Sequence, residues 1–140
     1  MYNKSLGVYK KNSLEAELSV ADPHKVIQLL MQGFLERVAQ AKGAIERSDY
    51  QLKSDRISSA NAILNGLKDS LDMSQGEISE RLFSLYEYMG ERLLDASVKM
   101  EVSPLDESMK LMLMIKESWD KIPDQEKQKA YTIRQSLGDL

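Results

Sequence analysis

The amino-acid sequence predicts an all-α fold, an antiparallel up-and-down four-helix bundle. Three observations lead to this prediction. Four segments carry apolar residues at spacings of three and four, the periodicity of one face of an amphipathic helix. No segment alternates apolar and polar residues with a period of two, so no β-strand is expected. The connections between the four segments are short, and short connections place successive helices antiparallel to each other.

The first helix is expected to begin within the sequence "ADPHKV". Asp22 can cap the free N–H groups of the first turn. Pro23 suits the first helical position because the N–H that proline lacks would be unsatisfied there. The apolar face of this helix consists of Ile27, Leu30, Phe34, Val38, Ala41 and Ile45.

The second helix is expected to open at "SDYQ". Ser48 and Gln51 have the spacing of a capping box, in which each side chain satisfies a backbone N–H of the other residue. The apolar face consists of Ile57, Ala60, Leu64, Leu67 and Leu71.

The third helix is expected to begin at "SQGE", where Ser74 and Glu77 have the same capping-box spacing. Gly76 then falls in the first turn of the helix, where glycine lowers the stability of the helix only a little. The apolar face consists of Ile78, Leu82, Leu85, Met89, Leu93, Ala96 and Met100.

The fourth helix is expected to open at "SPLD", with Ser103 as its cap and Pro104 at its first position, and Pro123 helps to stop it. Leu113 and Met114 point away from its apolar face and are expected to be exposed. That face consists of Leu105, Met109, Met112, Ile115, Trp119 and Ile122.

Three regions are expected along the chain, whose 140 residues are one domain's worth of sequence. Residues 22–122 form the helical bundle. Residues 1–21 are polar with scattered apolar side chains. Residues 123–140 are rich in charged residues and glutamine, and they form either frayed helix or a disordered tail.

Composition excludes several classes of function. The net charge is −3 and the pI about 5.3, so no basic field favours nucleic acid or anionic lipid. There is no cysteine, which excludes disulfides and thiolate metal sites. No apolar run approaches the roughly 20 residues of a membrane span, and the N-terminus has no apolar signal segment. The sequence therefore predicts a soluble, cytoplasmic protein without membrane insertion.

The sequence offers no set of residues for catalysis or for metal binding. The single histidine, His24, is expected to be exposed in the first turn of a helix and incidental. Di-iron bundles use Glu-x-x-His pairs, which do not occur here, and no glycine-rich phosphate loop is present. The protein is therefore predicted not to be an enzyme, with no catalytic residue, metal or cofactor. A solvated face away from the core is predicted for Glu77, Glu80, Glu87 and Glu91.

Three of the helices carry a second, shallower apolar strip beside the core face. Each strip contains small residues, which permit close approach of another backbone. One explanation is that these residues let neighbouring helices of the bundle pack closely. The other is a groove that binds an external amphipathic partner. The strips comprise Val26, Leu29 and Gly33 in the first helix, Ser59, Ile63, Gly66 and Ser70 in the second, and Phe83, Tyr86, Gly90 and Leu94 in the third.

The groove hypothesis defines a predicted partner-binding set. Tyr86 and Tyr88 each offer a broad ring with a polar tip, which is useful at the edge of an interface. Two other classes of function stay open: a ligand-binding bundle with buried strips, and a self-associating bundle whose strips pair in a homodimer. The partner-binding set is Val26, Leu29, Gly33, Ile63, Gly66, Phe83, Tyr86, Gly90 and Leu94.

Four stretches of the sequence, in order and spacing, resemble the flagellin-specific export chaperones, the FliS family. They are "ADPHKVIQLLMQGFLERVAQAKGAIE", "ANAILNGLKDSLD", "GEISERLFSLYEYMGERLLDA" and "ESWDKI". The resemblance covers about residues 9 to 122.

The resemblance implies an antiparallel helical bundle that binds newly made flagellin in the cytoplasm. Such a chaperone holds the disordered C-terminal segment of flagellin along hydrophobic grooves and prevents premature polymerisation. It then delivers the subunit to the flagellar type III export apparatus. The resemblance also implies that the N-terminal segment, residues 1–21 with Tyr2 and Tyr9, forms a cap over part of the groove. The free protein is expected to be a monomer or a weak homodimer.

Overall fold

The computed structural model describes residues 22–122, and this part of the chain is helical without any strand. The predicted all-α fold with four helices is therefore confirmed. The described residues belong to two compact units, one formed by Leu29–Lys121 and the other containing 22–28 and Ile122. The elements are α2 (Pro23–Glu46), α3 (Tyr50–Asp69), the short 3₁₀ helix η1 (Met73–Gln75), α4 (Glu77–Lys99) and α5 (Ser103–Asp120).

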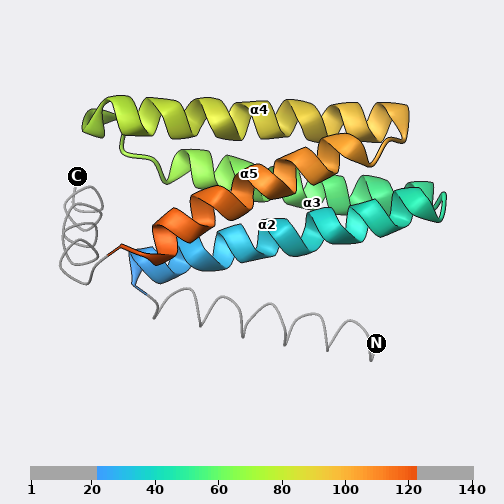
Figure 1. Ribbon diagram of the computed structural model, residues 1–140, viewed down its shortest axis with the longest axis horizontal. Coiled ribbons are helices and arrows are strands. Elements are labelled where there is room, and N and C mark those ends of the chain that lie inside the picture. Colours follow the sequence, from blue (N-terminus) through green and yellow to red (C-terminus); the bar gives the residue numbers. More distant parts are fainter. Residues whose placement is uncertain (1–21, 123–140) are drawn as a thin grey trace, which may run out of the picture. The chain divides into compact units, whose positions relative to one another are not determined.

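Within the unit Leu29–Lys121 the four helices form a bundle. Helix α4 packs directly against α3 on one side and against α5 on the other. Polar contacts join α2 to both of its neighbours: Arg37 Nε donates to Ser59 Oγ of α3 at 2.8 Å, and Lys42 Nζ lies 2.9 Å from Asp106 Oδ1 of α5. In Figure 1, α4 and α2 lie along opposite edges and α5 crosses obliquely between them.

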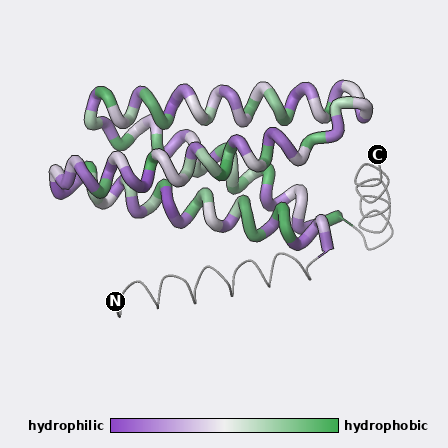
Figure 2. Tube along the Cα trace, turned by 180° about the vertical axis from the view of Figure 1, so that it is seen from behind, coloured by the Kyte–Doolittle hydropathy of each residue, from purple (hydrophilic) through white to green (hydrophobic). Residues whose placement is uncertain are grey.

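The bundle core draws apolar side chains from all four helices. Figure 2 shows hydrophobic and hydrophilic residues following one another along each helix, as an amphipathic helix requires. Burying one large apolar side chain stabilises the fold by about 1.5–3 kcal/mol, so this shared interior is the main source of stability. The most deeply buried residues are Met31, Phe34 and Val38 of α2, Leu64 and Leu67 of α3, Met89 and Leu93 of α4, and Leu105 and Met112 of α5.

Helix α2 begins as the sequence predicts. Asp22 Oδ1 accepts a hydrogen bond from Lys25 N at 2.8 Å, and Pro23 is the first helical residue. The carboxylate satisfies one of the backbone N–H groups that a helix start leaves without a partner.

Helix α3 is capped by Asp49, so the prediction of Ser48 as its cap is wrong. Asp49 Oδ1 accepts from Leu52 N at 3.1 Å. Ser48 has a φ of 55°, the left-handed conformation that commonly ends a helix. The N–H of Asp49 also donates to Ala44 O at 2.8 Å. Ser48 therefore belongs to the end of α2 and is not free to start α3.

The start of α4 also differs from the predicted capping box of Ser74 and Glu77. Asp72 accepts from both Ser74 N at 3.0 Å and Ser74 Oγ at 2.6 Å, which forms η1. Gly76, expected inside the first turn, is instead the residue before α4, with φ 75° and ψ −132°. Side chains strongly disfavour this conformation, so the turn from η1 into α4 requires glycine.

Helix α5 begins one residue earlier than predicted. Ser103 is its first helical residue, Val102 occupies the cap position without a side-chain hydrogen bond, and Pro104 lies in the first turn as expected. Ser108, outside the predicted apolar face, is fully buried because its hydroxyl donates to Pro104 O at 3.0 Å.

We predict that Gly76→Ala lowers the free energy of unfolding by about 1–3 kcal/mol, because alanine must adopt a strained backbone conformation. Urea denaturation followed by circular dichroism measures this change. Gly66→Ala is the matched control: a Cβ there meets no atom within 4 Å, and alanine is the better helix former, so stability should rise by about 0.5–1 kcal/mol. Equal effects of the two substitutions would contradict the requirement for glycine at position 76.

Candidate functional site

Two surfaces carry most of the predicted partner-binding residues. The first, here named the α2–α3 seam, consists of Leu29, Gly33, Ile63 and Gly66. The second, the α3–α4 face, consists of Phe83, Gly90, Leu94 and Val98 of α4, on the side that adjoins α3. Val26, the remaining predicted residue of α2, is half-buried.

The α2–α3 seam is closed at Gly33 by side chains of this chain. A Cβ at Gly33 would lie 3.3 Å from Ile63 Cδ1 and 3.3 Å from Arg37 Nη1. Arg37 Nη1 donates to Gly33 O at 3.2 Å, and its Nε reaches Ser59 of α3. The space beside this glycine is therefore occupied, which supports the explanation of close helix packing at this position. Leu29 and Ile63 stay half-buried at the edge of the seam.

The other two glycines differ from each other. A Cβ at Gly90 would lie 3.4 Å from Asn61 Oδ1 and 3.9 Å from Leu64 Cδ1, which is ordinary van der Waals contact, so this position faces α3 without requiring glycine. A Cβ at Gly66 would meet no atom within 4 Å. Gly66 is therefore the glycine of this set that leaves open surface.

The α3–α4 face exposes large apolar side chains. Phe83 is 39% exposed, Leu94 63% and Val98 74%. The sequence analysis missed Val98, although a step of four residues from Leu94 reaches it. Single exposed apolar residues are common, but three of them on one side of one helix form a patch of the kind that binds other proteins.

Tyr86 does not lie at the edge of this face, where the sequence analysis placed it. Its side chain is only 2% exposed, and it belongs to the buried face of α4. Conversely Ile78, predicted in the core, is 71% exposed. The two differences have separate causes. Tyr86 lies three residues before Met89 and seven before Leu93, so it shares the buried side of α4. Ile78 lies on that side too, about five turns before the buried Ala96, and its exposure follows from its place in the first turn of α4.

Lys68 lies between the helices at the α3–α4 face. Its Nζ is 3.0 Å from Glu87 Oε1 of α4 and 5.8 Å from the ring centroid of Phe83. The ammonium thus pairs with a carboxylate and lies over an aromatic ring at once. This contact orients the Phe83 ring on the surface.

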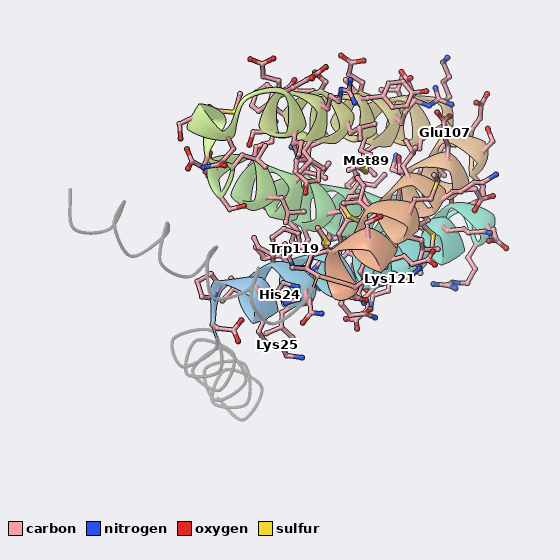
Figure 3. All side chains as sticks on the ribbon, turned by 60° about the vertical axis from the view of Figure 1, so that its left-hand side comes forward. His24, Lys25, Met89, Glu107, Trp119 and Lys121 are labelled. Atoms are coloured by element: carbon pink, nitrogen blue, oxygen red, sulfur yellow. The ribbon has the colours of Figure 1, made fainter. Side chains whose placement is uncertain are left out.

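Tyr88 joins α4 to α5. Its hydroxyl donates to the Glu107 carboxylate, which raises the pKa of Tyr88. Arg92 Nε donates to the same carboxylate at 3.1 Å, and Arg92 Nη1 reaches Asp95 Oδ2 at 3.1 Å. Figure 3 shows Glu107 at the junction of the two helices and Met89 in the interior beneath it. Tyr88 is therefore a structural link rather than a free interface residue.

Residues 22–122 contain no arrangement of side chains that indicates a metal site. No group of three His, Asp or Glu side chains in residues 22–122 could hold a metal ion. His24 is 3% exposed, so the prediction of an exposed histidine is wrong. It lies three residues before the buried Ile27, on the same side of α2.

Other predicted features have mixed outcomes. Leu113 and Met114 are exposed, as expected from their position off the apolar face of α5. Tyr2 and Tyr9, the predicted cap residues, lie outside the described residues. Among the helices that the structure describes, none has an apolar stretch long enough to cross a bilayer.

The family model and the related proteins that match this chain all belong to one family. The family model described as "Flagellar protein FliS" matches residues 5–126. The flagellar secretion chaperone FliSB of Pseudomonas aeruginosa is 46% identical over 120 residues, which is 85% of this chain and 95% of that protein. The flagellar secretion chaperones FliS of Vibrio cholerae and Salmonella typhimurium are 37% and 35% identical, over 85% and 87% of this chain and 88% and 93% of theirs.

We predict that Tyr86→Phe reduces the loss of stability at alkaline pH. Burial raises the pKa of Tyr86 to about 12, whereas an unfolded tyrosine has a pKa of about 10. The folded state therefore retains a proton that the unfolded state releases. The corresponding stability is complete below about pH 10 and is lost as the pH rises toward 12, by at most about 2.7 kcal/mol.

Urea denaturation between about pH 8 and about pH 11.5 measures this dependence. Tyr50→Phe, which changes an exposed ring, is the control. A steep decline that is the same in wild type and in Tyr86→Phe would show that the Tyr86 hydroxyl does not contribute to it.

Proposed function

Because the chain belongs to the FliS family, whose compared members are flagellar secretion chaperones rather than enzymes, we propose that it binds the disordered C-terminal segment of flagellin. Binding takes place in the cytoplasm and prevents premature polymerisation of flagellin. The chaperone then delivers flagellin to the flagellar type III export apparatus. The proposed function involves binding of a protein partner and requires neither a cofactor nor insertion into a membrane.

The observation that carries this proposal is the exposed apolar surface of the α3–α4 face. The bundle interior is filled without Phe83, Leu94 and Val98, so these side chains are available to a partner. Recognition of an amphipathic segment uses apolar anchors at helical spacing, and Leu94 and Val98 are one turn apart. A flagellin segment laid along this face would remove both from water.

The α2–α3 seam contributes a second part of the proposed binding surface. Leu29 and Ile63 are half-buried there and Gly66 faces open space, so the backbone of a partner could approach closely at Gly66. The role proposed for Gly33, Gly90 and Tyr86 is to support the surface from beneath, because Gly33 lies against Ile63, Gly90 faces α3 and Tyr86 is buried. The role proposed for residues 1–21 is a cap that competes with flagellin for part of the surface.

Two opposing contributions to the binding free energy determine the affinity for flagellin. Burial of a leucine-sized anchor contributes about 1.5–3 kcal/mol. Ordering a disordered segment costs free energy at the same moment, so the affinity is moderate for the area buried. A moderate affinity suits a chaperone that must release flagellin at the export apparatus.

We predict that Leu94→Ser weakens binding of a flagellin C-terminal peptide about tenfold or more, because the exposed anchor is lost. Isothermal titration calorimetry measures the Kd. Leu113→Ser, at a similarly exposed leucine of α5, should leave the Kd unchanged. Circular dichroism should be the same for both variants, since neither side chain is in the core.

Co-purification provides the second arm of the test. Full-length flagellin should co-purify with the chaperone, and flagellin without its C-terminal segment should not. Equal capture of both forms would refute the proposed client segment. Light scattering distinguishes client binding from self-association: a stable homodimer that flagellin peptide leaves intact would favour a self-associating bundle instead.

A further inference from the structure

The α3–α4 face has a definite register between its two helices. Lys53 Nζ of α3 donates to Ser97 O of α4 at 2.9 Å, Asn61 lies beside Gly90, and Lys68 pairs with Glu87. The two helices therefore run antiparallel with the N-terminal half of α3 beside the C-terminal half of α4. The exposed outer positions of α3 along this face are polar: Ser54, Ser58, Asn61 and Asn65.

Carboxylates flank the apolar side chains of this face. On α4 they lie three or four residues from Phe83 or Leu94, and on α3 Asp69 lies four residues from Asn65, so they share the same sides of their helices. Within residues 22–122 only one of them, Glu87, is in an ion pair. The four carboxylates are Asp69, Glu80, Glu87 and Glu91.

The lysines of the face are both engaged in internal contacts. Lys68 pairs with Glu87 and lies over the Phe83 ring. Lys53 is 8% exposed, and its ammonium is held by Ser97 O and lies 5.8 Å from the ring centroid of Tyr50. Arg92 turns to the other side of α4, where it pairs with Glu107 of α5. The three remaining carboxylates, Asp69, Glu80 and Glu91, are thus not neutralised from within the face.

The negative charge is local to this face rather than an expression of the net charge of the chain. The α2–α3 seam, at the opposite edge of α3, carries Arg37, which is bound to neutral oxygens, and Arg56, whose Nε is buried without a hydrogen-bond partner. Within residues 22–122 neither of these two arginines is in an ion pair.

We propose that the segment bound at the α3–α4 face is a basic amphipathic helix, with lysine or arginine residues flanking the apolar side chains that contact Phe83, Leu94 and Val98. This inference rests on the proposed function and specifies the chemistry of the client at this face. Unpaired carboxylates attract cations and repel carboxylates, so they select the charge of the segment. The apolar side chains supply most of the affinity.

Salt dependence of flagellin binding tests the proposal. The Kd of the flagellin C-terminal peptide is measured from roughly 0.05 M to roughly 0.5 M sodium chloride, where the screening length falls well below the size of the face. Binding to wild type should weaken as salt rises. The variant Glu80→Gln/Glu91→Gln should lose roughly twofold to fivefold in affinity for each neutralised carboxylate at low salt, and should show a flatter salt dependence.

The matched control removes the same charge elsewhere. Glu46→Gln/Glu117→Gln neutralises two exposed carboxylates, one of α2 and one of α5, and should retain the wild-type Kd and salt dependence. If both double variants weaken binding equally, the effect is that of net charge, and the proposed selectivity of the face is refuted. If neither variant nor salt changes the Kd, the proposal is refuted while flagellin binding stands.

A pair of designed peptides tests the charge selectivity of the α3–α4 face independently of whether flagellin is the client. Both have the same apolar stripe, one with flanking lysines and the other with flanking glutamates. The lysine peptide should bind wild type and perturb NMR signals of α3 and α4, and the glutamate peptide should bind at least tenfold more weakly. Stronger binding of the lysine peptide would support the charge selectivity of the face, whether or not flagellin binds. Failure of flagellin to bind would refute only the proposed function. Equal binding of the two peptides would overturn the inference.

Discussion

The close packing of α4 on α3 is the contact on which the rest of the molecule depends. Helix α4 is the one that packs directly against two neighbours, and a Cβ at Gly90 would stand at ordinary van der Waals distance from Asn61 and Leu64 of α3. Beside this contact Tyr86 lies in the core, while Phe83 and Leu94 remain outside on the side of α4 that adjoins α3. The exposed apolar surface therefore borders the buried contact between the two helices.

Small residues in the second strips turn out to have two separate roles. At Gly33 the missing side chain leaves room for Ile63 of α3 and for Arg37, which is the packing explanation that the sequence leaves open. At Gly66 nothing fills the space, and the binding explanation stays possible there. Helical spacing alone cannot separate these roles, because it describes one helix at a time. The difference depends on Ile63 and Arg37, which reach Gly33 from α3 and from the next turn of α2.

Much of the fold follows from the sequence, because apolar periodicity locates a helix whatever surrounds it. All four helices, and the exposure of Leu113 and Met114, were predictable in this way. The helix caps were less predictable where two adjacent residues can both act as the cap. Ser48 and Asp49 both have capping side chains, and Asp49 caps α3 because Ser48 has the left-handed backbone conformation that ends α2. The burial of Tyr86, beside the predicted core face of α4, depends on contacts between helices, and the exposure of Ile78 follows from its place in the first turn of that helix. Periodicity defines a face only to within about one residue step of roughly 100°.

Apolar anchors and unpaired carboxylates on one face serve a chaperone in different ways. Apolar contact is non-directional and tolerates many sequences, which suits a client that is held before it has its final structure. Charge acts at longer range and is sensitive to position, so it favours one class of segment. Because exposed charges add little to the total affinity, such a face gains selectivity without holding the client too tightly for release. An apolar face made strong enough to select by itself would lose that reversibility, and this is the physical reason to combine Leu94 and Val98 with unpaired acidic neighbours such as Glu91.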